Sequence, residues 1–483
     1  MNENLIFNKS VEERRTDFIN SPLKDIKTPE HFIPKEMLRD KLKLPSLGEL
    51  DVIRHYTKLS RLNFGVDTHF YPLGSCTMKY NPKINEDLAH MEDFTYLHPY
   101  QNENLIQGAL AVIYELEKIL SELTGMKRFT FQPSAGAHGE FAGMLIIKAF
   151  HTLNSNRRSK VLIPDSAHGT NPASAAMCGY KVEVIKSTKD GLVDTDELKS
   201  KVDAETAALM LTNPNTLGLF EERIMDISQI LHKKGALLYY DGANFNPLMG
   251  IVKPRLMGFD VMHLNLHKTF STPHGSGGPG AAAVGVSDNL VDFLPVPLVD
   301  KKENTYYFNY SLKHSIGKIK PFYGNFLVFV KAYSYLLRLG RNGLKRAAYN
   351  CVLNANYIRT KLKREFMPAS DKMCMHEVVF SCAKQKERGA SALDIAKRLI
   401  DFGIHPPTMY FPHIVREALM IEPTETESKE TLDYFIDRMI KINEETKSDL
   451  RNIKEAPHNT PVRRPDEVRA ARFPDLRWKE HGE

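Results

Sequence analysis

The sequence contains little cysteine, little tryptophan and no long apolar run. Its 483 residues include five cysteines and one tryptophan, and no two cysteines form a C-x-x-C pair. An odd number of scattered cysteines indicates neither a disulfide framework nor a zinc site, so we predict no metal centre. No stretch of eighteen apolar residues occurs, and the polar N-terminus does not resemble a secretory or transit peptide. We therefore expect a soluble, cytoplasmic protein.

The chain also has only a small excess of charge of one sign. The chain carries 65 lysines and arginines against 59 acidic residues, a formal net charge of +6, and these residues are not gathered in long runs. We therefore expect no nucleic-acid partner and no membrane partner. A mildly positive field would suit an anionic cofactor or an acidic protein. With 42% hydrophobic residues, the chain is long enough for one large core and a smaller second one.

The order of polar and apolar segments predicts four regions. These regions are an N-terminal arm with active-site loops (1–104), a large domain (105–325), a small domain (326–456) and a C-terminal tail (457–483). Residues 63–82 and 95–104 are too rich in glycine, proline and aromatics to form a regular element, and long loops of this kind are usually functional. The proline- and arginine-rich tail is expected to wrap a neighbouring surface.

Short apolar runs alternate with helical segments after residue 128. We predict strands at residues 129–132, 161–164, 181–186, 207–212, 236–241, 260–265 and 280–286. Such alternation favours an α/β fold with a mostly parallel sheet that is buried on both faces. After residue 287 the pattern changes to α+β, with helices at 326–366, 391–402 and 428–446 and strands at 376–382 and 416–421.

Polar residues follow the ends of several predicted strands. Ser134, His168, Asn213, Asp241 and Lys268 all lie at or just after such an end. The carboxyl ends of parallel strands meet at one edge of a sheet, where ligands bind. We therefore expect these five side chains to converge.

Lys268 is the centre of this set. A lysine at the end of a buried strand is either paired or held neutral, and a neutral amine is a nucleophile that can form a Schiff base. For a single lysine an exposed loop position is the commoner case, so the neighbouring residues must decide. Gly275, Gly277 and Gly280 satisfy G-x-G-x-x-G, but Pro279 interrupts the motif and a strand follows it. We therefore reject a dinucleotide fingerprint.

Two further patterns support cofactor chemistry. Ser134, Ala135, Gly136 and Ala137 open a predicted helix at 141–150, and small residues at a helix N-terminus can bind phosphate. Asp241, before Gly242 and Ala243, can cap a turn or hold a pyridine nitrogen protonated.

A phosphate turn, an acid and a lysine in this order are typical of pyridoxal phosphate enzymes. His168 is either a hydrogen-bonded structural residue or a ring that stacks on the cofactor. His267 is a second candidate for proton transfer.

Several long motifs carry a resemblance to a known family. They are FYPLGSCTMKYNP, SAHGTNPASA, LTNPNTLGLFE, DGANFNPLMG, HLNLHKTFSTPHGSGGPGA and TPVRRPDEVRAARFPDLRW. The chain resembles glycine dehydrogenase (decarboxylating), the P-protein of the glycine cleavage system, in the second subunit of its two-chain form. The resemblance implies a fold-type I pyridoxal phosphate enzyme with a seven-stranded sheet. His138 stands where a glutamine is common in this family.

The same resemblance implies roles for individual residues. Lys268 forms the Schiff base, Asp241 contacts the pyridine nitrogen and His168 stacks on the ring. The phosphate is held by Ser134, Ala135, Gly136, Ala137 and Thr269, and the predicted cofactor site also includes Asn213, Ala243 and His267.

The implied reaction is decarboxylation of glycine with transfer of the aminomethyl group to the lipoyl disulfide of the H-protein. We also expect a first P-protein subunit as partner, with two copies of each chain.

Selectivity for glycine requires a tight site, and the two aromatic loops are the candidates. Their polar residues are the predicted substrate contacts, although each could equally reflect ordinary loop packing: His69, Ser75, Thr77, His98 and Tyr100. Cys76 is either a redox-sensitive thiol or, more simply, a structural one.

Two other functions stay open from the residues. One is another pyridoxal phosphate enzyme, such as an amino-acid decarboxylase or aminotransferase, which would not need a lipoylated acceptor. The other is a non-catalytic scaffold subunit, for which Lys268, Asp241 and His168 would have no use together.

Overall fold

The computed structural model describes residues 3–11, 14, 27, 29–39, 44–154, 157–275 and 280–479. The chain forms two compact units. One is the continuous segment Val66–Ala456, and the other combines Met1–Gly65 with Pro457–Glu483. The boundaries predicted at residues 104, 325 and 456 stay predictions.

A seven-stranded sheet forms the centre of the larger unit. Its strand order is β1-β7-β6-β5-β4-β2-β3, and only β7 runs against the other strands. The strands are β1 (Arg128–Thr130), β2 (Lys160–Pro164), β3 (Lys181–Ile185), β4 (Thr206–Thr212), β5 (Leu237–Gly242), β6 (Val261–Asn265) and β7 (Ala282–Val286). The mostly parallel α/β sheet predicted from the sequence is confirmed, with each strand within two residues of its expected position.

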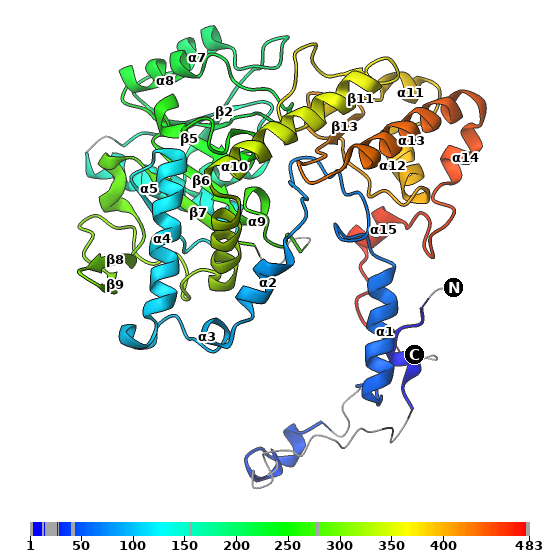
Figure 1. Cartoon of the computed structure of the whole chain (residues 1–483), viewed down its shortest axis with the longest axis horizontal. Coiled ribbons are helices and arrows are strands. Elements are labelled where there is room, and N and C mark those ends of the chain that lie inside the picture. The colour runs from blue at the N-terminus through cyan, green and yellow to red at the C-terminus, as the bar shows by residue number, and fades with distance from the viewer. Residues whose placement is uncertain are drawn as a thin grey trace. The chain divides into compact units, whose positions relative to one another are not determined.

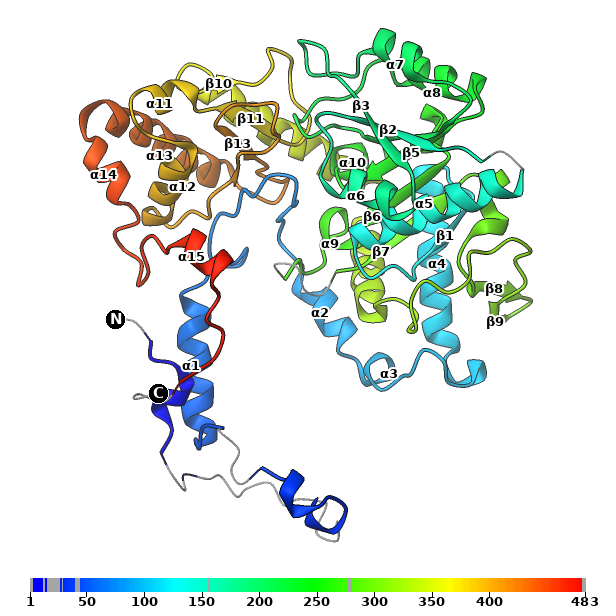
Figure 2. The same ribbon diagram turned by 180° about the vertical axis from the view of Figure 1, so that it is seen from behind.

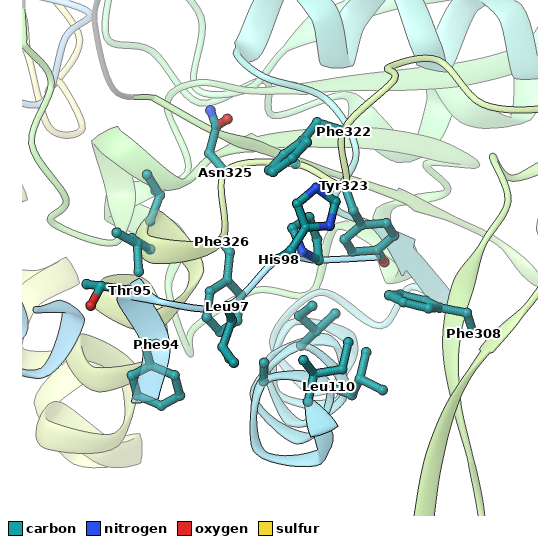
Figure 3. A pocket seen from close by; sticks show the side chains of 17 residues that line it. Phe94, Thr95, Leu97, His98, Leu110, Phe308, Phe322, Tyr323, Asn325 and Phe326 are labelled. Carbon is teal, nitrogen blue, oxygen red and sulfur yellow. The ribbon is translucent and has the colours of Figure 1, made fainter. Parts of the chain in front are cut away.

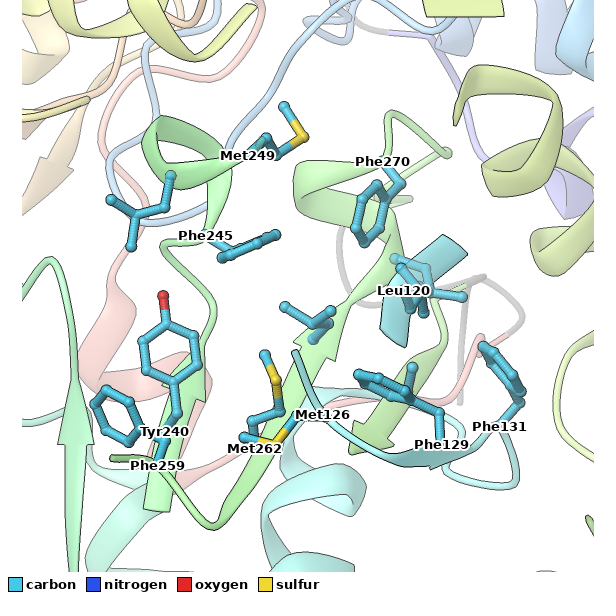
Figure 4. Close-up of a cluster of buried hydrophobic side chains, with 14 of the residues drawn as sticks. Leu120, Met126, Phe129, Phe131, Tyr240, Phe245, Met249, Phe259, Met262 and Phe270 are labelled. Carbon is cyan, nitrogen blue, oxygen red and sulfur yellow. The ribbon is translucent and has the colours of Figure 1, made fainter. Parts of the chain in front are cut away.

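Both faces of this sheet are covered by helices (Figures 1 and 2). Every residue of β4 is buried, with Leu209 and Leu211 in one core and Ala208 and Met210 in the other. Such a strand must be apolar throughout, because alternate side chains enter opposite cores. The first core includes α4 (Gln107–Thr124), α7 (Thr195–Lys201), α8 (Ile224–Lys233) and part of α10, and the second includes α5 (Gly136–Leu153) and α6 (Thr170–Met177). Figure 4 shows aromatic side chains and methionines of the first core.

The C-terminal part of the larger unit has its own sheet and core. The strands β10 (Met367–Pro368), β11 (Val378–Ser381), β13 (Ala418–Ile421) and β12 (Thr408–Met409) pair antiparallel in this order. They share a core with α12 (Ala392–Asp401), α13 (Lys429–Ser448) and α14 (Leu450–Glu455), and the short helix α11 (Ala383–Glu387) follows β11. The predicted α+β pattern after residue 326 is therefore observed. A separate hairpin consists of β8 (Leu298–Lys302) and β9 (Thr305–Asn309).

Helix α10 (Phe326–Leu362) contributes to both cores. It is broken at Gly340, whose backbone has φ 56° and ψ −175°, a conformation that glycine adopts at low cost. Residues before and just after the break, such as Leu336 and Leu344, belong to the core of the large sheet. Ile358 and Leu362 belong to the C-terminal core. Figure 1 shows α10 running from the large sheet toward the C-terminal helices.

The loop at residues 66–82 contains no helix or strand, as predicted, and is held against the C-terminal sheet. Leu73 forms an isolated bridge with Ile421. Nζ of Lys79 lies 2.8 Å from Oε1 of Glu425, and both side chains are buried. This loop leads into α2 (Lys83–Ala89) and α3 (Glu92–Thr95).

The smaller unit is formed by the two ends of the chain. It contains α1 (Glu49–Arg61) and α15 (Glu467–Arg472). The ring of Trp478 stacks on Phe7 at 5.0 Å, and its Nε1–H donates to Oδ1 of Asn8 at 3.2 Å. The tail therefore packs on the N-terminal arm of its own chain. None of the helices in the described ranges is long and apolar enough to span a membrane.

Candidate active site

Asp241 lies near the end of β5 and is almost completely buried. Its Oδ1 accepts a hydrogen bond from the Ala243 amide at 3.0 Å and lies 3.3 Å from Nε2 of His263. Its Oδ2 accepts from Nδ2 of Asn171 at 3.2 Å and from the Thr212 hydroxyl at 3.3 Å. Burial by itself raises the pKa of Asp241, but His263, the Ala243 amide and Lys268 outweigh it, so the pKa is lowered. The carboxylate therefore stays charged inside the protein.

A second buried carboxyl, Glu140, lies beside Asp241. Nδ2 of Asn171 donates to Oε2 of Glu140 at 2.9 Å as well as to Asp241. Burial, followed by repulsion from Asp241, raises the pKa of Glu140 to about 9, so this group is protonated at neutral pH. Glu140 offers one oxygen within 4.8 Å of atoms of Asp241 and His263. The cluster therefore holds a single negative charge, and our prediction of no metal stays a prediction.

Lys268 lies in the one-turn helix α9 (Leu266–Thr269), directly after β6. It is half-buried, and within the described ranges its ammonium makes no hydrogen bond or ion pair. The positive charge of Lys268 lowers the pKa of Asp241, Glu140, Glu377 and Glu422, because opposite charges favour the ionised carboxyls. An amine without a protein partner, surrounded by buried acids, is available to a ligand.

His168 follows β2 and lies near the same charges. Its Nδ1 accepts a hydrogen bond from the Thr170 amide at 3.2 Å, and its ring contacts Phe411 edge-on at 5.8 Å. The residue is exposed, yet enough protein surrounds the ring for desolvation to lower its pKa. The charge of Asp241 opposes this lowering of the pKa, and the charge of Lys268 adds to it.

The predicted phosphate turn is the N-terminus of the eighteen-residue helix α5. The Ser134 amide donates to Nδ1 of His138 at 3.2 Å, so this histidine organises the turn. A Cβ atom at Gly136 would lie 2.2 Å from Nδ2 of Asn265, so the position requires glycine. Oδ1 of Asn265 and Oγ1 of Thr269 are buried and have no partner in the part of the chain that the structure describes. The Thr269 hydroxyl can donate to an anion bound near this helix N-terminus, whereas Oδ1 of Asn265 can only accept.

Three other predicted cofactor residues lie at the same edge of the sheet. Oδ1 of Asn213 accepts from the Glu221 amide, while its buried Nδ2 lacks a partner among the described residues. Ala243 contributes its amide to Asp241. His267 lies 3.3 Å from the Ala281 amide, and desolvation first, then Lys268, lower its pKa to about 3. This neutral ring is directed toward the start of β7.

Two of the predicted substrate residues, Ser75 and Thr77, lie against a group of buried acids. The Ser75 amide donates to Oε2 of Glu377 at 2.8 Å. The Thr77 amide and hydroxyl donate to Oε2 and Oε1 of Glu422 at 2.9 and 2.6 Å. Both residues have positive φ, 63° and 51°, which is uncommon outside glycine and marks a strained turn. The acids hold this turn in place.

The other predicted substrate residues lie apart from these acids. Nδ1 of His69 is 2.7 Å from the Thr68 hydroxyl. His98 and Tyr100 lie near α4 and the start of α10, and His98 lines an apolar pocket of about 370 Å³ (Figure 3). Within the described ranges neither residue bonds to the group around Lys268. Burial raises the pKa of Cys76 to about 11, so its thiol is protonated at neutral pH.

Sequence reasoning missed Glu140, His263, Asn171, His376, Glu377 and Glu422. Asn171 and His263 lie within the quoted family motifs, whereas the other four are single polar residues within or beside apolar segments. The glycine motif around Gly277 lies partly outside the described residues. The strand β7 that follows it agrees with our rejection of a dinucleotide fingerprint.

Comparison with known proteins identifies the family. A chain from Caldanaerobacter subterraneus called "Probable glycine dehydrogenase (decarboxylating) subunit 2" is 59% identical over 98% of both chains. A chain of the same name from Pyrococcus furiosus is 54% identical over 100% of this chain and 97% of its own. This chain belongs to the glycine dehydrogenase (decarboxylating) subunit 2 family. The resemblance inferred from the sequence is therefore confirmed.

Domain families and solved structures agree with this family. Residues 347–465 match the glycine dehydrogenase C-terminal domain, and residues 139–294 match the aminotransferase class-V family. A crystal structure of glycine decarboxylase (P-protein) in inhibitor-bound form has a TM-score of 0.74 at 20% identity, over 85% of this chain and 94% of its own. A cysteine desulfurase from Thermococcus onnurineus has a TM-score of 0.61 at 16% identity, over 78% and 95%. The predicted fold class is confirmed.

Proposed function

We propose that this chain is the pyridoxal-phosphate-binding subunit of a glycine dehydrogenase. It would decarboxylate glycine and transfer the aminomethyl group to the lipoyl disulfide of an H-protein. The observation that carries the proposal is the unpaired amine of Lys268 at the end of β6, one strand away from the buried, charged Asp241 on β5. Membership of the glycine dehydrogenase family supplies the substrate.

The residues at the strand ends fit the cofactor. Lys268 would bind its aldehyde carbon, and Asp241 would hold the pyridine nitrogen protonated. The α5 N-terminus from Ser134 to Ala137, with Thr269, would hold the phosphate. Bound pyridoxal phosphate supplies an electron sink for the electron pair that CO2 leaves behind.

Residues of this chain set the charges of Asp241 and Glu140 at the site. Glu140 is neutral, so Asp241 is the one negatively charged group in the cluster of Glu140, Asp241 and His263. Asn171 holds both carboxyls in place through one amide. His168 would stack on the cofactor ring, and Asn213 and Ala243 would complete the pocket wall.

The relatives are named as second subunits, and we propose that this chain also assembles with a related first subunit, with two copies of each. Its location in the cytoplasm stays a prediction. A scaffold without activity is disfavoured, because a buried acid pair and a free amine cost folding energy without stabilising a scaffold.

The test is the Lys268→Ala variant in complex with the partner subunit. We expect the visible absorbance of lysine-bound pyridoxal phosphate to vanish and glycine decarboxylation to stop, while the far-ultraviolet circular dichroism is unchanged. Lys253→Ala, which removes an exposed lysine paired with Glu122, is the matched control. Retention of the absorbance band in Lys268→Ala would refute the assignment. Decarboxylation without a lipoylated acceptor would favour a different pyridoxal phosphate enzyme.

A further inference from the structure

A second group of buried titratable residues lies outside the predicted cofactor contacts. His376 and Glu377 directly precede β11, and Glu422 directly follows β13. All three are fully buried and offer one atom each within 4.8 Å of one another. Nε2 of His376 is 3.9 Å from an oxygen of each carboxyl, and within the described ranges neither ring nitrogen has a hydrogen-bond partner. The antiparallel pairing of β11 with β13 brings these side chains together.

Only neutral groups bond to the two carboxyls. Glu377 accepts from the Ser75 amide at 2.8 Å and from Nδ2 of Asn244 at 3.4 Å. Glu422 accepts from the amide and the hydroxyl of Thr77. No lysine or arginine in the described ranges forms an ion pair with either carboxyl. Two buried carboxyls this close cannot both be ionised without a cation, because each charge loses its hydration and repels the other.

The titration of the two groups agrees with this geometry. Burial, and then repulsion from Glu422, raises the pKa of Glu377 well above its ordinary value. Burial raises the pKa of Glu422 to about 7, against the lowering effect of Thr77, Lys268 and Lys79. Burial and Lys268 lower the pKa of His376 to about 3, so this ring is neutral and takes no proton from the acids. The two carboxyls therefore titrate as a pair.

A hydrogen bond from Asn244 joins the pair to the segment that carries Asp241. Lys268 acts on both carboxyls and on Cys76, which lies between Ser75 and Thr77. Asn244, which donates to Glu377, follows three residues after Asp241 in the same turn. Among the described residues, the other charged or titratable groups that interact with the pair are Lys268, Lys79, His376, Cys76, Cys351 and Cys374.

We propose that Glu377 and Glu422 share one proton at neutral pH, and that this pair is the acid that protonates the sulfur freed when the lipoyl disulfide opens. The inference rests on the proposed function. In the net reaction the bond between the glycine α-carbon and its carboxylate breaks, CO2 leaves and the electron pair of that bond forms the carbon–sulfur bond. The sulfur–sulfur bond breaks and its electron pair goes to the leaving sulfur. The glycine ammonium loses one proton and that sulfur gains one, so the pair gives up its proton and is later recharged.

The first test counts the shared proton without turnover. Infrared spectra of the complex with its partner subunit should show the carbonyl stretch of a protonated carboxyl that is lost or shifted in both Glu377→Gln and Glu422→Gln. Glu140→Gln should remove a different band, and Glu222→Gln, an exposed residue, should remove none. A band that persists in both pair variants would overturn the proposal, and so would a stoichiometric metal ion found by elemental analysis.

The second test asks whether Glu377 and Glu422 act as the general acid. With lipoamide as acceptor, both pair variants should lose at least about 100-fold in the rate of thiol formation, the usual contribution of a general acid. Glycine should still change the cofactor absorbance at the same half-saturating concentration. An unchanged thiol rate would overturn the acid role. If the native complex itself did not decarboxylate glycine, the proposed function would fail, while the infrared band would still report the shared proton.

A third variant keeps the test decisive if a glutamine variant does not fold. Thr77→Val removes the hydroxyl that donates to Glu422 at 2.6 Å and that favours its ionised form. The infrared band of the pair should then persist to higher pH than in the native protein. A band that titrates at the same pH in both proteins would contradict the proposal.

Discussion

Glu140 and Asp241 accept hydrogen bonds from the same Asn171 amide but differ in charge. Asp241 also receives the Ala243 amide and faces His263, whereas Glu140 has only Asn171 and Lys268 to oppose its burial. The difference arises from the number of favourable partners, since both side chains are nearly inaccessible. Two chemically similar acids therefore have opposite protonation states at neutral pH.

This difference predicts how stability depends on pH. The folded pKa of Glu140, about 9, lies above its ordinary value of 4.5, so the folded chain binds more protons than the unfolded chain between these values. The unfolding free energy should therefore fall as pH rises through this window, by up to about 1.4 kcal/mol per pH unit from this residue. Glu140→Gln removes the titration. Urea unfolding of the cofactor-free chain from pH 6 to 9 should show a shallower decline in the variant.

Glu222→Gln is the control for that experiment, because this exposed carboxyl should leave the pH dependence of the native chain unchanged. Equal slopes for Glu140→Gln and the native chain would mean that Glu140 is ionised at neutral pH.

Lys268, Asp241 and His168 could be proposed from the sequence, because each lies at or just after the end of a recognisable apolar strand. Glu140 and His263 could not be predicted in the same way. Glu140 lies inside helix α5 and His263 inside β6, where a single polar residue usually reflects local packing. The contact of His263 with Asp241 becomes visible only in the pairing of β5 with β6, where the two residues lie opposite each other.

Among the elements, α5 approaches the sheet through glycine. A Cβ atom at Gly143 would lie 2.4 Å from Cε2 of Tyr239 on β5, so Gly143→Ala should destabilise the protein by about 1–3 kcal/mol through overpacking. In α4, a Cβ atom at Gly108 would meet nothing within 4 Å, so Gly108→Ala should stabilise by about 0.5–1 kcal/mol. Urea unfolding of both variants measures the contrast. Effects of the same sign would show that close packing of α5 is not the cause.

The loop at residues 66–82 depends on Lys79. Its ammonium is buried and donates to Glu425, Asn246 and Tyr335. Burial lowers the pKa of Lys79, but the attraction of Glu425 outweighs it, so the pKa is raised. Lys79→Met would leave Glu425 buried without its cation and should cost about 3–5 kcal/mol of unfolding free energy.

The control for Lys79 is Lys83→Met, because Lys83 pairs with Asp67 at the exposed surface. This change should cost less than about 1 kcal/mol. Similar losses in the two variants would show that burial of the Lys79 pair is unimportant.

The strands could be located from their apolar runs, because a sheet buried on both faces leaves a continuous signal. The path of the loop at 66–82 could not. Its position depends on contacts such as Ser75 with Glu377 and Thr77 with Glu422, which join residues 302 and 345 positions apart and leave no local pattern.

For the molecule as a whole, we predict that the chain changes its assembly when the first subunit is present. Light scattering of the two chains, alone and mixed, should show a larger complex, with a mass equal to two copies of each after mixing. Glycine decarboxylation should rise with it. Unchanged mass and activity on mixing would contradict the proposed partnership.

Helix α10 connects the first core of the large sheet to the C-terminal core. Its first half is built into the core of the sheet that carries Lys268, and its last turns into the core behind Glu377 and Glu422. Leu344 belongs to the first of these cores and Ile358 to the second, and the helix between them is unbroken, because its one residue with non-helical torsion angles, Gly340, comes before both. A tilt of one core is therefore passed to the other along this stretch of helix.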